Sequence, residues 1–211
     1  MTSDRRNPGQ EPDCGKKGGK ETGGSKISKE GWYSLARRLP SPNCNERPAV
    51  SGSNVSLLVI HNISLPPGEF GGCHIEQLFT NRLPPSGHPC FAELDGLEVS
   101  AHLLIKRNGE CVQFVSFTER AWHAGESCFR GREHCNDYSV GIELEGTDLS
   151  GYTDTQYLVL AEVTQALLDR YPAIGRERIV GHSDIAPDRK TDPGPGFDWQ
   201  RFLSLVTCVN S

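Results

Sequence analysis

The sequence predicts a single α/β domain in which a mixed central β-sheet is flanked by helices. Three observations lead to this prediction. Short apolar runs of strand-like composition recur along the chain, one long segment has helical periodicity, and an Asn-Gly pair separates two of the strand-like runs.

Length and charge narrow the class of protein. The chain has 211 residues, which is enough for one domain with a real core. Its 22 basic and 27 acidic side chains give a net charge of −5, so we expect no nucleic-acid partner. No apolar run reaches the roughly 18 residues of a membrane span, and the first residues lack the apolar stretch of a secretory signal peptide. The eight cysteines form no CxxC pair, which favours reduced thiols in a cytoplasmic protein, although their even number leaves disulfides open.

The chain divides into a tail and a folded part. Residues 1–30 are rich in glycine and lysine and have almost no large apolar side chain, so we expect a disordered extension. The folded domain is expected over residues 31–208.

The first elements of that domain are a strand, a short helix and a hairpin. SLLVI at 56–60 is typical of a buried strand that leads into His61 and a loop rich in proline and glycine. CHIEQLFTN at 73–81 fits one or two helical turns. Asn108-Gly109 predicts a hairpin with a type I′ turn, because both residues tolerate positive φ.

The later elements are two strands and two helices. YSVGIELEG at 138–146 alternates, with apolar side chains on one face and Gly141, Glu143 and Glu145 on the other. Residues 153–172 have helical periodicity and a capping box, and a proline ends the segment. RIVGH at 178–182 resembles another short strand, and residues 197–206 fit a last helix.

Two histidines and an aspartate are candidates for a metal site. His61 and His182 each follow a predicted strand and precede a loop rich in proline, where functional groups often lie. Asp192 is tied to His182 by a segment whose prolines limit its freedom. Two imidazoles and a carboxylate form a suitable catalytic zinc site with a fourth position open. A pair of hydrogen-bonded surface histidines is the alternative.

Four further residues could serve such a site. Glu143, on the polar face of its strand, could move protons, and Lys190 could stabilise an oxyanion. The alternatives are a solvated strand face and a surface lysine. Trp122 and His123 lie among small residues in a loop that could contact a sugar or peptide, although Trp122 could equally belong to the core.

Four segments resemble the zinc-dependent N-acetylmuramoyl-L-alanine amidases, in particular the cytoplasmic type that acts on 1,6-anhydro muropeptides. They are VIHNISLPPGEFGG, RAWHAG, CNDYSVGIELEGTD and GHSDIAPDRKTDPGPGFDW, and the similarity runs from about residue 32 to about residue 206. The wider family includes phage lysozyme-type amidases and peptidoglycan recognition proteins.

The resemblance implies hydrolysis of the amide between 1,6-anhydro-N-acetylmuramic acid and L-alanine of muropeptides during peptidoglycan recycling. The residues that it assigns are His61, His182 and Asp192 for zinc, Glu143 and Lys190 for catalysis, and Asn62, Trp122 and His123 for substrate. We expect a monomer whose partner is the muropeptide, acting in the cytoplasm without a membrane. Cys90 departs from the family pattern, because the resemblance leads us to expect a tyrosine there.

Two other functions compete with this one. A non-catalytic muropeptide-binding module would typically lack a zinc ligand, and all three candidates are present here. An exported amidase that acts on intact cell wall would be expected to carry a signal peptide, which the sequence does not show.

Overall fold

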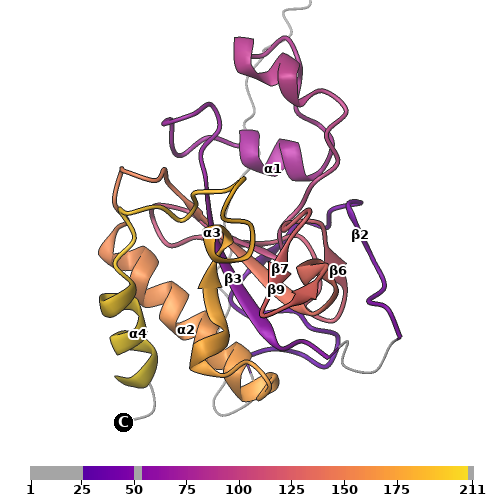
Figure 1. The fold of residues 1–211 in the computed structure, drawn as a ribbon. Helices are drawn as coiled ribbons and strands as arrows, with labels where there is room; N and C mark the ends of the chain where they lie inside the picture. Colours follow the sequence, from indigo (N-terminus) through magenta and orange to yellow (C-terminus); the bar gives the residue numbers. More distant parts are fainter. Residues whose placement is uncertain (1–25, 50–53, 209–211) are drawn as a thin grey trace, which may run out of the picture.

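A six-stranded mixed sheet forms the centre of the molecule, which a computed structural model describes for residues 26–49 and 54–208 (Figure 1). The strand order is β1-β5-β4-β9-β3-β10. Their bounds are β1 Arg37–Arg38, β3 Leu57–Ile63, β4 Leu103–Ile105, β5 Cys111–Gln113, β9 Ser139–Glu145 and β10 Ile179–Gly181. Neighbouring strands are parallel except β4 and β5, which are antiparallel, so the mixed sheet predicted from the sequence is confirmed.

Short elements surround this sheet. Two small antiparallel ribbons pair β2 with β6 and β7 with β8. The strands of these ribbons are β2 Cys44–Asn45, β6 Arg120–Ala121, β7 Cys128–Phe129 and β8 Arg132–Glu133. The helices are α1 His74–Phe79, η1 Pro89–Leu94, η2 Cys135–Asp137, α2 Asp154–Arg170, η3 Arg176–Arg178, α3 His182–Ile185 and α4 Trp199–Cys208.

One face of the sheet is covered by α2 and α4. These helices share an apolar cluster with alternate side chains of the central strands, among them Leu58 and Ile60 of β3 and Val140 and Ile142 of β9. Figure 1 shows both helices side by side on that face. The opposite side chains of β3 and β9 point to the other face, so α2 and α4 leave that face to other parts of the chain.

The strand β9 is buried along its whole length. All seven of its residues are inaccessible or nearly so, because it lies between β4 and β3 and is covered on both faces. The prediction of alternating faces is therefore right, but the polar face is not solvated. Glu143 and Glu145 are 8% and 1% exposed.

The Asn-Gly hairpin is present, but with a different turn. The Lys106 carbonyl accepts from the Gly109 N–H, and the Lys106 N–H donates to the Glu110 carbonyl. Gly109 has a φ of +85°, whereas Asn108 is not among the residues with positive φ. The type I′ prediction is therefore wrong. The turn is a type I turn followed by a glycine bulge, which needs left-handed backbone at one residue only.

The helix α2 begins as its sequence predicts. Thr153 Oγ1 accepts from the Gln156 N–H, and the Gln156 side chain accepts from the Thr153 N–H, which together form the capping box. The predicted strand ends differ. His61 lies inside β3, which continues to Ile63, and His182 lies just beyond β10, in the single turn of α3.

The folded part begins before residue 31. Ile27 is 2% exposed, packs in the cluster under α2 and pairs with Tyr33, while Lys26 forms an ion pair with Glu162. Residues 26–30, which were expected to belong to the extension, therefore pack on the domain. The rest of the expected extension, residues 1–25, lies outside the described residues. Within the described ranges no helix is both long and apolar enough to cross a membrane.

Candidate metal centre

Two adjacent strands place His61 beside Glu143. β3 and β9 run parallel with His61 opposite Glu143, and both side chains point to the face that α2 and α4 leave uncovered. β10 pairs with the other edge of β3, so His182 follows a strand that is also next to His61. Neighbouring strands thus bring together residues that lie more than 80 positions apart in the chain, such as His61 and Glu143.

Three ligand atoms converge at this point. His61 Nδ1 lies 3.0 Å from His182 Nδ1 and 3.1 Å from Asp192 Oδ2, and His182 Nδ1 lies 3.2 Å from the same oxygen. Among the described residues, these three form the one group whose geometry could hold a metal ion. The structure therefore brings together all three residues that the sequence analysis selected as ligands.

The donor set fits zinc. His182 Nε2–H donates to the Ala124 carbonyl, which can only accept, so a neutral His182 directs the Nδ1 lone pair at the centre. Burial lowers the pKa of His61 to about 4, against the opposing effect of Asp192, so the His61 ring is neutral near pH 7. Tetrahedral zinc with bonds of about 2.0–2.2 Å separates its ligand atoms by about 3.3–3.6 Å, slightly more than the separations here.

The loop that carries Asp192 is fixed at several points. The Ser183 N–H donates to the Asp192 carbonyl, and the Pro193 carbonyl accepts from Tyr152 Oη and from Asn62 Nδ2. Asn62 follows His61 in β3 and therefore points to the opposite face, where it also donates to Asp148. The structure places Asn62 behind the metal-ligand loop and engages its amide with protein groups.

Glu143 has the environment of a carboxyl group that can hold a proton. Burial, together with the negative charge of Asp192, raises the pKa of Glu143 well above its ordinary value, and Lys190 opposes this shift. Within the described part of the chain, its Oε2 atom is buried without a hydrogen-bond partner. Such an unsatisfied group is costly to keep in a fold, which favours a role toward a ligand or substrate.

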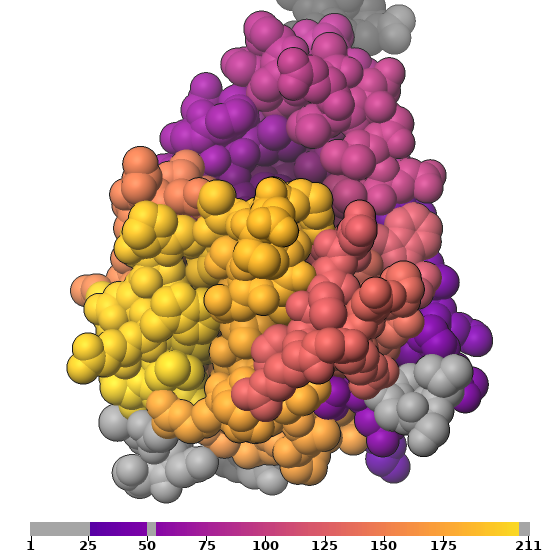
Figure 2. Space-filling view, in the orientation of Figure 1, coloured from indigo at the N-terminus to yellow at the C-terminus, as the bar shows by residue number. Residues whose placement is uncertain are grey.

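The charge of Lys190 acts on the same centre. Its charge acts on the pKa of both Glu143 and His61, and its backbone N–H is held by the Ala186 carbonyl. Figure 2 shows the yellow-orange segment around residues 183–195 at the surface, with a recess between it and the magenta lobe that contains α1 and η1.

The other predicted residues occupy different positions. His123 lies behind His61, with its Nδ1 atom 3.0 Å from His61 Nε2, on the side away from the ligand atoms. Trp122 is half-buried and donates from its indole nitrogen to Asn45 on β2. Cys90 is half-buried in η1, and its sulfur lies 3.0 Å from His88 Nδ1.

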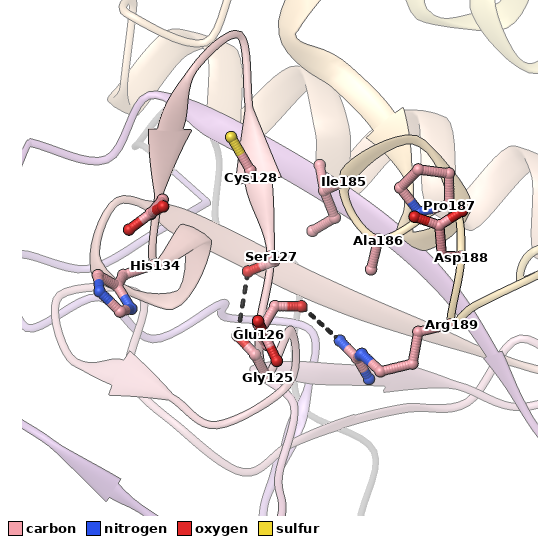
Figure 3. A pocket seen from close by; sticks show the side chains of 11 residues that line it. Gly125, Glu126, Ser127, Cys128, His134, Ile185, Ala186, Pro187, Asp188 and Arg189 are labelled. Carbon is pink, nitrogen blue, oxygen red and sulfur yellow. Dashed lines mark hydrogen bonds between the residues drawn. The ribbon is translucent and has the colours of Figure 1, made fainter.

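A cavity of about 740 Å³ lies beside the metal centre. It lies open to solvent between the β7–β8 ribbon and the loop after α3, and Figure 3 shows Glu126, Cys128, His134 and Arg189 around it. Arg189 donates to the carbonyls of Ala124 and Glu126 and so joins the two walls. None of the predicted site residues lines this cavity.

Three residues that support the ligands carry no recognisable sequence signal. Tyr152, Asn136 and Ser139 are bonded to the ligand loop or to the groups behind the histidines. No spacing rule points to them, because each acts through a contact between distant segments.

Comparison with known proteins gives consistent matches. Residues 51–195 match the profile of the Amidase_2 family, described as N-acetylmuramoyl-L-alanine amidase. The chain is 61% identical over 178 residues to the 1,6-anhydro-N-acetylmuramyl-L-alanine amidase AmpD of Citrobacter freundii, covering 84% of this chain and 94% of the relative. It is 60% identical to AmpD of Escherichia coli strain K12, covering 86% of this chain and 97% of that protein.

Solved structures agree with this result. A crystal structure of a selenomethionine derivative of AmpD superposes with a TM-score of 0.82 at 60% identity, covering 85% of this chain and 99% of that one. A second is AmiD of E. coli in complex with its substrate anhydro-N-acetylmuramic acid-L-Ala-D-γ-Glu-L-Lys. It has a TM-score of 0.55 at 28% identity and covers 85% of this chain and 65% of AmiD.

Proposed function

Since this chain belongs to the N-acetylmuramoyl-L-alanine amidase family and is a hydrolase of that class, we propose that its reaction is the zinc-dependent cleavage of the amide between 1,6-anhydro-N-acetylmuramic acid and L-alanine in muropeptides. This is a reaction of peptidoglycan recycling. The observation that carries the proposal is the convergence of His61 Nδ1, His182 Nδ1 and Asp192 Oδ2 beside the buried carboxyl of Glu143.

The proposed roles follow from the contacts. His61, His182 and Asp192 would hold the ion. Bound zinc supplies Lewis acidity, which polarises an amide carbonyl and lowers the pKa of water. Glu143 takes a proton from the attacking water and delivers it to the leaving amine of L-alanine, because its raised pKa suits a group that must hold a proton in between. Lys190 donates to the oxyanion that forms as the carbonyl is attacked.

The competing function is a muropeptide-binding module without catalysis. Glu143 argues against it, because a binding module has no use for a buried carboxyl whose Oε2 atom lacks a partner among the described residues. We propose that Trp122 contacts the substrate, since this residue is half-exposed.

We also propose that the enzyme is monomeric and cytoplasmic. Gel filtration tests the oligomeric state, and cell fractionation tests the location.

The deciding experiment is a mass-spectrometric assay of the purified full chain with anhydromuramyl-tripeptide. One sample is loaded with zinc, and a matched sample is treated with a chelator and then resupplied with zinc. We expect release of free tripeptide that stops with chelation and returns with the metal. Intact substrate from protein that holds one zinc ion would support the binding module instead and make Cys90 the first residue to test.

A further inference from the structure

A second layer of groups lies directly behind the two histidine ligands. His61 Nε2 contacts His123 Nδ1 at 3.0 Å, and His182 Nε2 contacts the Ala124 carbonyl at 3.2 Å. His123 and Ala124 are consecutive residues, so one short segment of chain supports both ligands from behind.

This layer decides which nitrogen of each ligand carries hydrogen. The Ala124 carbonyl can only accept, so His182 must donate from Nε2. His123 Nε2 lies 3.1 Å from Ser139 Oγ, so His123 can donate there and accept from His61 at Nδ1. In that arrangement both ligands carry hydrogen on Nε2 and direct a free Nδ1 lone pair at the metal position.

The fold makes room for this arrangement. A Cβ atom at position 141 of β9 would lie 2.5 Å from atoms of the His123 ring, so only glycine lets the ring lie against the strand. The ring of His123 meets that of His61 edge-on, with centroids 5.0 Å apart.

One side chain holds the whole segment in place. Asn136 Oδ1 accepts from the N–H groups of both His123 and Ala124, at 3.1 Å and 2.8 Å. Asn136 is itself fixed by η2 and by the half-buried Arg47, which donates to its carbonyl at 3.0 Å. A single amide oxygen thus sets the position of the two groups that contact the ligands.

We propose that Asn136 is a positioning residue that, through His123 and the Ala124 carbonyl, holds both histidine ligands in the tautomer that binds metal. The inference rests on the proposed zinc site and adds to it a residue that would touch neither metal nor substrate. Outer groups of this kind typically change metal affinity by about 10–100-fold when they are lost.

The test compares Asn136→Ala with Asn136→Asp, which keeps an oxygen acceptor. The matched control is Asn43→Ala, because the Asn43 side chain also joins distant segments, through Asn81 and the Val99 carbonyl, away from the ligands. Asn43 is buried, whereas Asn136 is half-buried. Zinc affinity of the full chain is measured by competition with a chelator. The tautomers of His61 and His182 are read from ¹⁵N chemical shifts of the metal-free chain.

We expect Asn136→Ala to bind zinc about 10–100-fold more weakly and to show mixed tautomers at both histidines. Asn136→Asp should recover most of the affinity. Asn43→Ala should lower thermal stability but leave the affinity and the tautomers unchanged. Wild-type affinity and tautomers in Asn136→Ala would overturn the inference, and so would an equal loss of affinity in Asn43→Ala.

A second pair of variants covers the case in which Asn136→Ala does not fold. In His123→Asn the amide oxygen can take the place of Nδ1 as acceptor, whereas His123→Leu offers none. The inference requires tighter zinc binding and a purer His61 tautomer in His123→Asn than in His123→Leu, and equal values would refute it. Failure of the wild-type chain to bind zinc would instead refute the proposed function.

Discussion

Two glutamates on one strand show how single residues with the same pattern acquire different roles. Glu143 and Glu145 share a face of β9 and could not be separated by alternation. Both oxygens of Glu145 accept from backbone N–H groups, those of Gly71 and Arg107. The Oε2 atom of Glu143 has no such partner within the described residues. The sequence could predict a polar face, but not which carboxylate the neighbouring loops engage.

Glu143→Gln should therefore retain zinc and lose turnover. The amide cannot shuttle a proton, so we expect kcat to fall by about 10²–10⁴-fold. The measurement is steady-state hydrolysis of anhydromuramyl-tripeptide alongside bound zinc by elemental analysis. Glu145→Gln is the matched control and should lower stability more than kcat. A wild-type kcat in Glu143→Gln would place this residue outside the chemistry.

The buried histidines make the free energy of unfolding of the metal-free protein depend on pH. The pKa of His61 is lowered from 6.5 to about 4, and those of His102 and His123 are also lowered, in each case mainly by burial. The unfolded chain therefore takes up protons first as pH falls. The contribution of these histidines to the free energy of unfolding is fully present above about pH 6.5 and is lost as the pH falls toward 4. For His61 alone the loss is about 3 kcal/mol.

Urea unfolding of the metal-free chain at a series of pH values checks this. Protonation of Glu143 has the opposite effect on the free energy of unfolding, because its pKa is raised in the folded chain. The experiment is therefore best done in the Glu143→Gln variant, where this residue does not titrate. In that variant we expect the midpoint to fall steadily between pH 6.5 and pH 4. A constant midpoint would show that the histidines are protonated equally in both states.

Substrate residues were harder to assign from the sequence than ligands. His61, His182 and Asp192 could be selected because few side chains bind zinc and because both histidines lie at or near the ends of strand-like segments. Asn62 follows the ligand His61 in the sequence, but strand alternation points its side chain to the opposite face of the sheet. His123 belongs to the RAWHAG segment, but its ring lies behind His61.

At the scale of elements, local signals predicted helix starts and hairpins better than strand ends. The capping box of α2 and the Asn-Gly turn depend on neighbouring residues only. The end of β3 depends on pairing, because β9 carries seven paired positions that draw His61, Asn62 and Ile63 into the strand. The type of the Asn-Gly turn was predicted wrongly, because a left-handed backbone at Gly109 alone is enough to close the hairpin.

The cap of α2 provides a test at this scale. Thr153 Oγ1 accepts from the Gln156 N–H and also donates to the Arg107 carbonyl in the hairpin. Thr153→Ala should cost about 1–2 kcal/mol of unfolding free energy in urea, with kcat unchanged. Thr155→Ala, at an exposed position on the same helix, is the control and should cost less. Equal costs would show that the cap adds nothing.

For the whole molecule, the main revision is where the folded part begins. Composition predicts a tail to residue 30 because glycine and lysine dominate it. Composition averages over a window and cannot detect one anchoring side chain. Ile27 fills a place in the cluster under α2, and Lys26 bonds to that helix.

Two truncations test this revision. A chain that starts at residue 26 should unfold at a higher urea concentration than one that starts at residue 31. The difference should be about 2–5 kcal/mol, the usual cost of losing a buried isoleucine. Equal stability would mean that Ile27 contributes nothing and that the boundary at residue 31 is adequate.

The separation of the ligands along the chain has a consequence during synthesis. His182 and Asp192 come 121 and 131 residues after His61. A ribosome-bound chain that has not yet released β10 and the loop after it offers at most one of the three ligands. The proposed zinc site is therefore complete only once the chain has emerged as far as Asp192, and an ion bound there could stabilise only a chain in which β10 and the loop after it are already present.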